Sequence, residues 1–445
     1  MKKSRYNVCL RMSTDIRLQM LNDLRRLHDH AYERVGFLFT KTKKLRTNTV
    51  IVIATKYMPV DDADYLQDKS VGAKINSTAI RKAMQYCFSN KTGCFHVHLH
   101  DHIGKPGPSS TDKHGLPPIV DSFQNITNEE ANGIIILSED SHFIQLKISK
   151  EISFIFPQQI SVIGLPMLST FSKVIKRHVE ETYSRQSFLG AHTQVLFENI
   201  KVGIVGYGGG GSHIGQQLAH LGVKNIKVFD YDKIERTNLN RLIGGWFSDI
   251  KNSHLKTIIA KRTINKILPT ASVQEINTKW QENSDILQTC DIVFGCVDSY
   301  TEREQLEAEC RRYLIPYIDI GMDVHNIDDG VPAMSGQVIL SMPGRPCMRC
   351  MGFITERKLA LEAAKYGDIG GRPQVVWPNG VLASTAVGIF VDLLSGWTHS
   401  ENKLFYLSYN GNTGEVTEHI RLKFTDKHCL HYPIESAGPP AFTTL

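Results

Sequence analysis

Residues 201–241 read KVGIVGYGGGGSHIGQQLAHLGVKNIKVFDYDKIERTNLNR, and this stretch decides the fold of the chain. Its apolar run at 202–205 predicts a buried parallel strand that ends in a glycine-rich turn. Ser212 is the predicted N-cap of the helix that follows. A second strand is predicted at 225–229, and Asp230 comes directly after it.

This pattern predicts a nucleotide-binding α/β unit with a mostly parallel sheet. Glycines let the backbone approach phosphates, the helix N-terminus attracts their charge, and the acid can hold a ribose hydroxyl. The spacing by itself also fits a nicotinamide enzyme, so the function depends on the residues that follow. The turn glycines expected at the nucleotide are Gly206, Gly208, Gly209 and Gly211.

Bulk composition sets the limits of the interpretation. A chain of 445 residues is expected to form two or three domains, and a net charge of +6 is mild. Residues 1–50 carry more basic than acidic groups, which we interpret as a solvated surface, so no nucleic-acid partner is expected. We find no apolar run of membrane-spanning length and no signal peptide. Nine cysteines without disulfide-like regularity predict a cytoplasmic location.

A histidine-rich stretch, CFHVHLHDHIGKPGPSSTD, occupies residues 94–112. His96, His98 and His100 alternate, so on a strand they share one face. Asp112 follows a Gly/Pro loop that can fold back toward them. Two neutral imidazoles and one carboxylate leave an open position, as in catalytic zinc sites, where bound water has a pKa of about 7.

Two further residues complete this predicted site. Glu33 stands just before an apolar run at 35–39 and is the candidate proton shuttle, while Ser109 can hydrogen-bond an oxyanion. These residues resemble the JAMM (JAB/MPN) metalloprotease motif, with its glutamate, H-x-H and S-x-x-D. That family cleaves isopeptide or peptide bonds at the C-terminal end of ubiquitin-like proteins. The matched residues are Glu33, His98, His100, Ser109 and Asp112.

The chain departs from this motif in two ways. Asp101 replaces the proline that usually follows the second histidine, and the gap to Asp112 is one residue longer than usual. His96 and His98 form a competing pair, with a still longer gap. We expect a JAMM-like domain at 1–155, a linker at 156–175 and a second domain at 176–445.

The sequence after Asp230 argues against a nicotinamide enzyme. Such an enzyme has no need for a second acid at Asp232 or for the N-L-N-R sequence that ends at Arg241. Lys256 lies on the next predicted helix. A later strand, DIVFGCVD, ends at Asp298, which should face the ligand crevice at the carboxyl ends of the strands.

Together with the lead-in TYSRQ, these segments resemble the ThiF/MoeB/ubiquitin-activating family, which adenylates the C-terminal carboxylate of ubiquitin-like proteins. The resemblance implies ATP and Mg²⁺, with Asp230 at the ribose and Asp298 at the metal. It also implies that Arg185 enters the site of a partner subunit, and hence a homodimer. The residues expected to position the nucleotide and neutralise phosphate are Asp232, Asn238, Arg241 and Lys256, with Lys251 as the alternative to Lys256.

A second metal site is implied by the same resemblance. Cys347 and Cys350 form a C-x-x-C, and family members often close a structural zinc site with a second pair near the C-terminus. Here that region reads DKHCLHY, so Cys429 with His431 or His428 would complete four ligands. A reduced C-x-x-C without metal is the alternative. No cysteine lies in VVWPNGVLAS, so the sequence supports adenylation and leaves thioester transfer open.

The sequence therefore predicts an α/β protein with two activities on a ubiquitin-like protein, zinc-dependent cleavage and ATP-dependent adenylation. A bacterial-type conjugation or defence pathway is the expected setting. The expected partner is a ubiquitin-like or sulfur-carrier β-grasp protein, together with a conjugating-enzyme-like protein. Alternatives are activation of a sulfur carrier for biosynthesis and a binding scaffold with degenerate sites, and a nicotinamide oxidoreductase ranks last.

Overall fold

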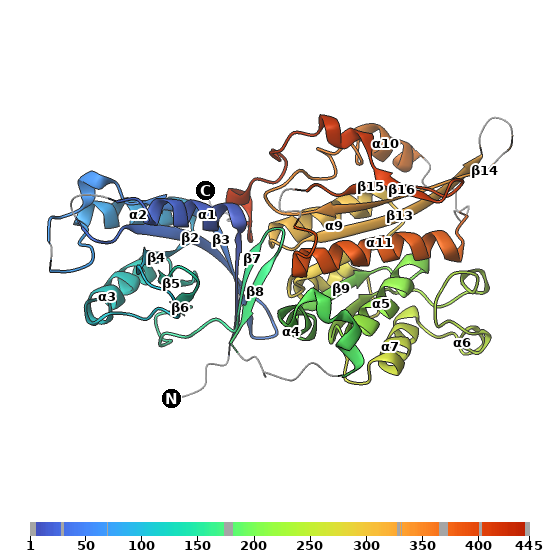
Figure 1. Cartoon of the computed structure of the whole chain (residues 1–445), viewed down its shortest axis with the longest axis horizontal. Coiled ribbons are helices and arrows are strands. Elements are labelled where there is room, and N and C mark those ends of the chain that lie inside the picture. The colour runs from blue at the N-terminus through green and yellow to red at the C-terminus, as the bar shows by residue number, and fades with distance from the viewer. Residues whose placement is uncertain are drawn as a thin grey trace. The chain divides into compact units, whose positions relative to one another are not determined.

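The computed structural model (Figure 1) describes residues 6–27, 31–68, 70–172, 181–326, 330, 332–364, 373–399 and 403–440. The chain packs as two units. The N-terminal unit comprises Met1–Val162, Ser169–Lys173 and Pro433–Leu445, and the C-terminal unit comprises Ile163–Leu168 and Val174–Tyr432. Each contains helices and one large sheet, so the predicted α/β class is confirmed.

The N-terminal unit is built on an eight-stranded mixed sheet in the order β6-β5-β4-β2-β3-β1-β7-β8. Its strands are β1 (Asn7–Ser13), β2 (Val35–Lys44), β3 (Thr49–Pro59), β4 (Gly93–Leu99), β5 (Asn132–Leu137), β6 (His142–Lys147), β7 (Gln159–Ile163) and β8 (Leu168–Phe171). Helix α1 (Thr14–Leu24) packs on β3, while α3 (Ser110–Ile126) packs on β4, β5 and α2 (Ser77–Asn90).

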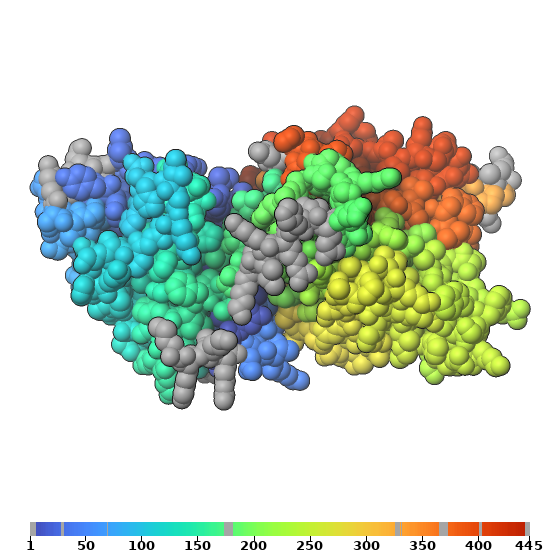
Figure 2. Space-filling view, turned by 60° about the horizontal axis from the view of Figure 1, so that its bottom comes forward, coloured from blue at the N-terminus to red at the C-terminus, as the bar shows by residue number. Residues whose placement is uncertain are grey.

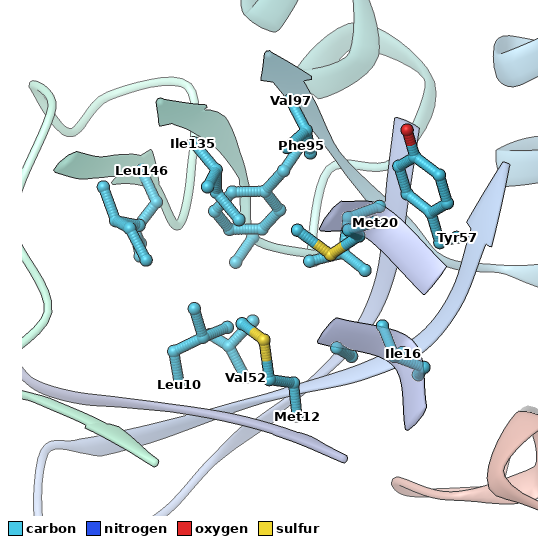
Figure 3. Close-up of a cluster of buried hydrophobic side chains, with 14 of the residues drawn as sticks. Leu10, Met12, Ile16, Met20, Val52, Tyr57, Phe95, Val97, Ile135 and Leu146 are labelled. Atoms are coloured by element: carbon cyan, nitrogen blue, oxygen red, sulfur yellow. The ribbon is translucent and has the colours of Figure 1, made fainter. Parts of the chain in front are cut away.

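Strand β4 carries His96 and His98, His100 follows it directly, and the alternation of the strand fixes where the two strand histidines point. Phe95 and Val97 face a buried cluster that includes residues of α1 (Figure 3). Successive side chains of a strand point to opposite faces, so His96 and His98 lie on the other side of the sheet. There His96 contacts Phe37 edge to face.

The segment predicted as a linker, 156–175, contains β7 and β8, which extend the first sheet beyond β1. The prediction was wrong over these strands because the Gly/Pro sequence between them, GLP, forms a hairpin tip. The short 3-10 helix η6 (Ile434–Ser436), near the other end of the chain, also belongs to the N-terminal unit, where Ile434 packs against its main core.

The C-terminal unit has a second eight-stranded sheet, in the order β11-β10-β9-β12-β13-β14-β15-β16. The first five strands run parallel and the last three add antiparallel. The strands are β9 (Lys201–Val205), β10 (Asn225–Phe229), β11 (Ser272–Ile276), β12 (Ile292–Gly295), β13 (Tyr317–Asn326), β14 (Pro332–Ser341), β15 (Tyr406–Asn410) and β16 (Glu415–Glu418). The order reverses between β9 and β12, and ligands of open α/β sheets bind at such a point.

Helices cover this sheet, and in the space-filling view residues of the α6 to α8 region form a continuous surface (Figure 2). The helices are α4 (Ala191–Asn199), α5 (Gly209–Leu221), α6 (Phe247–Lys251), α7 (Lys256–Ile267), α8 (Ser284–Gln288), α9 (Tyr300–Arg312), α10 (Glu356–Ala364) and α11 (Val376–Ser395). The remaining 3-10 turns are η1 (Asp62–Asp64), η2 (Glu181–Leu189), η3 (Arg236–Asn238), η4 (Trp280–Asn283) and η5 (Ile420–Phe424).

Helix α11 corrects the expectation that no segment reaches membrane-spanning length. By length and composition it could cross a membrane. It packs instead against α5, β13 and β14 (Figure 1). Most of its apolar residues are buried. Its apolar composition is therefore explained by its place in the core of the C-terminal unit.

Candidate functional site

A cavity of about 290 Å³ lies where β9, β10 and β12 end, at the reversal of strand order. Most of the predicted nucleotide residues line it, although they come from five separate stretches of the chain. They are Gly206, Gly208, Gly209, Asp230, Asp232, Asn238, Arg241, Lys256 and Asp298.

The turn glycines divide into two kinds. Gly206 has φ +87°, and a Cβ there would lie 2.5 Å from the carbonyl oxygen of Cys296. A Cβ on Gly211 would overlap the carbonyl oxygen of Gly206, and Gly211 does not line the cavity. A Cβ on Gly208, in contrast, would meet no described atom within 4 Å. Gly206 and Gly211 are thus needed for chain packing, while Gly208 faces open space in the cavity wall.

The helix after the turn begins earlier than predicted. Gly208, not Ser212, is the N-cap of α5, and its backbone groups start the helix without a side-chain cap. Ser212 lies inside α5, where its hydroxyl donates to the Gly209 carbonyl (2.9 Å) and accepts from the N–H of Ile243 (3.0 Å). Because the first turn of α5 forms directly from the glycines, its N–H groups point at the cavity.

Asp230 ties the turn to the strand beside it. Its carboxylate accepts hydrogen bonds from the backbone N–H of Tyr207 (2.7 Å) and of Asp232 (2.9 Å). Burial raises the pKa of Asp230, and the nearby Lys256 ammonium, 3.8 Å away, opposes this shift. Lys256 also pairs with the exposed Asp232 carboxylate at 2.7 Å. The cavity therefore holds a lysine whose charge is shared between two acids.

Lys256, and not the alternative Lys251, lies at the cavity, because Lys251 ends α6 and is exposed. Arg241 donates to the Thr237 carbonyl (2.6 Å) and to the Asn240 side chain (3.0 Å), which leaves further guanidinium donors for a ligand. Asn238 accepts from the N–H of Glu235 at 2.9 Å and so shapes this loop.

Sequence reasoning missed several cavity residues. Gln374 donates to Asp298 at 3.4 Å, and Asn379 at the start of α11 lies against Gly209. Arg303 is buried and donates to the Val297 carbonyl from Nε (3.0 Å) and Nη2 (2.7 Å). Arg303 belongs to the SYTER sequence after Asp298 and could have been predicted from it. An arginine in the first turn of a helix that follows a strand can bind the carbonyl groups between the two elements. Lys279 also lines the cavity, without a signal in the sequence.

Arg303 is held by a fully buried acid. Its Nη1 lies 3.4 Å from Asp319, which also accepts from the Tyr317 hydroxyl (2.9 Å). The Arg303–Asp319 ion pair thus holds the turn at Val297 and Asp298 in place. Arg185, by comparison, is exposed in η2 and does not line the cavity. Its predicted role concerns a second subunit and stays a prediction.

In the N-terminal unit, His98, His100 and Asp112 converge. His98 Nε2 and His100 Nε2 lie 3.2 Å apart, and Asp112 Oδ2 lies 3.6 and 3.7 Å from them. Ligands of a tetrahedral zinc ion, each about 2.1 Å from it, stand about 3.4 Å apart. The three donors therefore fit one zinc ion.

Glu33 and Ser109 flank these donors. Glu33 Oε1 lies 3.9 Å from His100 Nε2, and burial raises the pKa of Glu33. Ser109 caps α3: its hydroxyl accepts from the N–H of Asp112 (3.1 Å), and its own N–H donates to the Asp112 carboxylate (2.8 Å). Burial favours the neutral form of Asp112, but hydrogen bonds from His98 and Ser109 hold its pKa below the usual range.

The competing pair, His96 with His98, is not assembled in the same way. His96 is buried behind His98, and burial lowers its pKa to about 3, so it is a neutral core residue. Glu33 and Asp112 approach His100 instead. The geometry thus favours His98 and His100 as the ligand pair.

The second predicted metal site forms a compact cluster of Cys347, Cys350, Cys429 and His431, whose ligand atoms lie within 4.8 Å of one another. His431 Nδ1 stands 3.4 Å from the sulfurs of Cys347 and Cys350, which are 3.5 Å apart. His428 is not part of the cluster among the described residues. The donor set, three thiols and an imidazole, suits a structural zinc ion.

Residues 183–431 match the model of the ThiF family. Ubiquitin-like modifier-activating enzyme 5 of Drosophila ananassae is 28% identical over 164 residues, covering 34% of this chain and 39% of that protein. Molybdopterin-synthase adenylyltransferase of Haemophilus influenzae is 33% identical over 147 residues, covering 32% and 60%. For eight of the curated relatives that it matches, the chain spans between 39% and 61% of the relative's length. E. coli MccB with ATP, a solved structure, is 22% identical, covers 57% of this chain and 75% of that chain, and has a TM-score of 0.45.

Proposed function

Because the chain belongs to the ThiF family, whose model matches more than half of it, we propose that its C-terminal unit adenylates a carboxylate with ATP. The observation that carries this proposal is the cavity that gathers an open glycine turn, Asp230, Lys256 and Asp298. A nicotinamide enzyme would use the turn and Asp230, but it would leave the lysine and the second strand-end acid unexplained.

The residues suit the chemistry of this step. A carboxylate that attacks the α-phosphate of ATP meets a negatively charged partner, so positioning and charge neutralisation supply most of the catalysis. Gly208 lets the phosphates approach the N-terminus of α5, and Asp230 accepts from the ribose. When ATP binds, Lys256 releases the Asp232 carboxylate and pairs with a phosphate group. Arg241 neutralises further phosphate charge. Asp298 would hold Mg²⁺, which bridges phosphate oxygens when bound.

For the substrate we propose the C-terminal carboxylate of a small β-grasp protein. Relatives are named as a ubiquitin-like modifier-activating enzyme and a molybdopterin-synthase adenylyltransferase, which supports either a modifier or a sulfur carrier. A thiocarboxylate product in the presence of sulfide would favour the sulfur carrier. A covalent conjugate formed with a conjugating-enzyme-like protein would favour the modifier.

Calorimetry tests the nucleotide first, because it needs no protein substrate. The intact chain should bind ATP with Mg²⁺ and ignore NADH, and micromolar NADH binding without ATP binding would refute the proposal. Asp298→Ala should then abolish ATP–pyrophosphate exchange on a β-grasp protein that ends in glycine. Retained exchange in this variant would remove Asp298 from the proposed role.

For the N-terminal unit we propose a zinc-dependent peptidase of the JAMM type, acting on a ubiquitin-like protein. The supporting observation is the convergence of His98, His100 and Asp112 at zinc-ligand spacing with Glu33 beside them. Bound zinc would supply Lewis acidity and an activated water. Glu33 can then accept a proton and return it to the leaving amine, and Ser109 orients Asp112.

Glu33→Ala tests this proposal, because it should abolish cleavage of a precursor and leave ATP–pyrophosphate exchange on the trimmed form intact. Loss of both activities in this variant would argue against independent sites. A scaffold with degenerate sites is the alternative. It would be favoured by a zinc content near zero together with no AMP formation.

Four further properties belong to this proposal. The cluster around Cys347 would hold a structural zinc ion, and the enzyme would act as a cytoplasmic homodimer. Arg185 of one subunit would complete the site of the other. Mixing Arg185→Ala with Asp298→Ala protein should then restore part of the activity, because one intact site forms at a mixed interface.

A further inference from the structure

The carboxylate of Glu33 lies against a glycine that is far from it in sequence. A Cβ built on Gly72 would stand 2.5 and 2.6 Å from the two carboxylate oxygens of Glu33. Carbon and oxygen atoms in ordinary contact are about 3.5 Å apart, so the carboxylate occupies the space that a side chain at position 72 would fill.

The backbone of Gly72 also holds the glutamate. Its carbonyl oxygen accepts hydrogen bonds from the N–H of Tyr32 and of Glu33, both at 2.9 Å. The next residues anchor this part of the chain, because Ala73 and Ile75 pack against the buried cluster around Phe37. Gly72 is therefore fixed in place, because its carbonyl oxygen binds the backbone of Tyr32 and Glu33 and its α-carbon lies against the Glu33 side chain.

The two residues after Glu33 are also held in place by hydrogen bonds. The buried Arg34 donates to the Asp62 carboxylate (2.7 Å) and to the Arg26 and Leu27 carbonyls (2.6 and 3.1 Å). The N–H of Val35 donates to the Tyr65 hydroxyl (2.8 Å). Backbone motion at Glu33 is thus restricted on both sides, and Gly72 borders its side chain.

We propose that Gly72 is a positioning residue for Glu33: the missing side chain at position 72 leaves the space that places the Glu33 carboxylate beside His100. This inference rests on the proposed peptidase role of the N-terminal unit. No positive φ is involved at Gly72, so the requirement for glycine comes from the carboxylate and not from the backbone. An alanine would push the flexible end of Glu33 away and leave the fold intact.

The matched set of variants is Gly72→Ala, Glu33→Gln and Gly107→Ala. Gly107 is the control, because a Cβ there meets no described atom within 4 Å. All are made in the full chain, with Co²⁺ as the probe. The spectrum of His98→Ala protein, which keeps only the cysteine cluster, is subtracted to isolate the absorption of the histidine site.

Gly72→Ala should fold and bind Co²⁺ within about twofold of wild type, because the metal ligands are untouched. The pH midpoint of its cobalt absorption should move toward that of Glu33→Gln, while Gly107→Ala follows wild type. Shortening the acid in the double variant Gly72→Ala/Glu33→Asp should reverse part of the shift, since the shorter side chain clears the added methyl group.

The outcomes distinguish failure of this inference from failure of the peptidase proposal on which it rests. If wild type and Glu33→Gln have the same midpoint, Glu33 does not sense the metal and the peptidase proposal fails. If those two differ but Gly72→Ala matches wild type, the positioning role is wrong. Loss of folding in Gly72→Ala would also overturn it, because it would show that position 72 serves the backbone.

Discussion

Alanine substitutions at Gly206 and Gly208 separate the glycine that builds the nucleotide turn from the one that faces a ligand. Gly206 has φ +87° and sits against the carbonyl oxygen of Cys296. Gly208 lines the same cavity with no described atom within 4 Å of an added Cβ. Gly206→Ala should therefore damage the fold, and Gly208→Ala should damage ATP binding.

The two magnitudes follow from the two environments. Left-handed backbone costs an L-residue about 1–2 kcal/mol, and relief of overlap with a backbone oxygen adds about 1–3 kcal/mol. Gly206→Ala should thus lower the free energy of unfolding by about 2–5 kcal/mol. Gly208→Ala should change it by less than about 1 kcal/mol. Its methyl group should weaken ATP binding by about 2 kcal/mol, or about 30-fold in Kd.

Chemical denaturation measures the first quantity and calorimetry with Mg²⁺ and ATP measures the second. Gly388→Ala is a suitable control, since a Cβ there also meets nothing within 4 Å but the residue is outside the cavity lining. Wild-type ATP affinity in a folded Gly208→Ala protein would refute the reasoning, because the phosphates could not then lie against this turn.

Three other outcomes follow. Elemental analysis should find two zinc ions per chain, and one after either His98→Ala or Cys350→Ser; an unchanged count in either variant contradicts that site. Arg303→Met leaves a buried acid unpaired, so denaturation should show a loss of about 3–5 kcal/mol, part of which a second substitution, Asp319→Asn, restores. Burial raises the pKa of Glu130 from 4.5 to about 7, so the folded state keeps a proton that the unfolded chain loses. Glu130 should therefore contribute fully to stability below pH 4.5, and this contribution, about 3 kcal/mol, should be lost as the pH rises to 7; Glu130→Gln should remove this part of the pH dependence.

The sequence predicted those parts of the site that local chemistry specifies. The strand, glycine turn and acid of the nucleotide unit occupy one continuous stretch, and the alternation of His98 and His100 needs only a strand to put them on one face. Asp112 could be predicted because the Gly/Pro loop before it lets the chain fold back toward His98 and His100. In each case the spacing along the chain determines the spacing in three dimensions.

Contacts between residues that are far apart in the sequence could not be predicted in this way. Arg303 and Asp319 meet only because β13 lies beside β12, and Asn379 reaches Gly209 only through the packing of α11 on α5. Gly72 carries no chemical group at all, so composition and motif offer no reason to single it out. The misassigned cap at Ser212 had a different cause, since a preferred capping residue competed with glycines that start the helix by themselves.

The two proposed reactions fit together chemically. Hydrolysis of a peptide or isopeptide bond at the end of a ubiquitin-like protein releases a free carboxylate, and adenylation consumes a free carboxylate. On these two proposals, the product of the site around His98 would be a substrate for the site around Asp298, while a modifier already joined to a target could enter only the first. One chain with both sites raises the effective concentration of the trimmed product at the second site. Under these proposals, ATP-driven activation would act only on modifiers with a free C-terminal carboxylate, including those that cleavage releases.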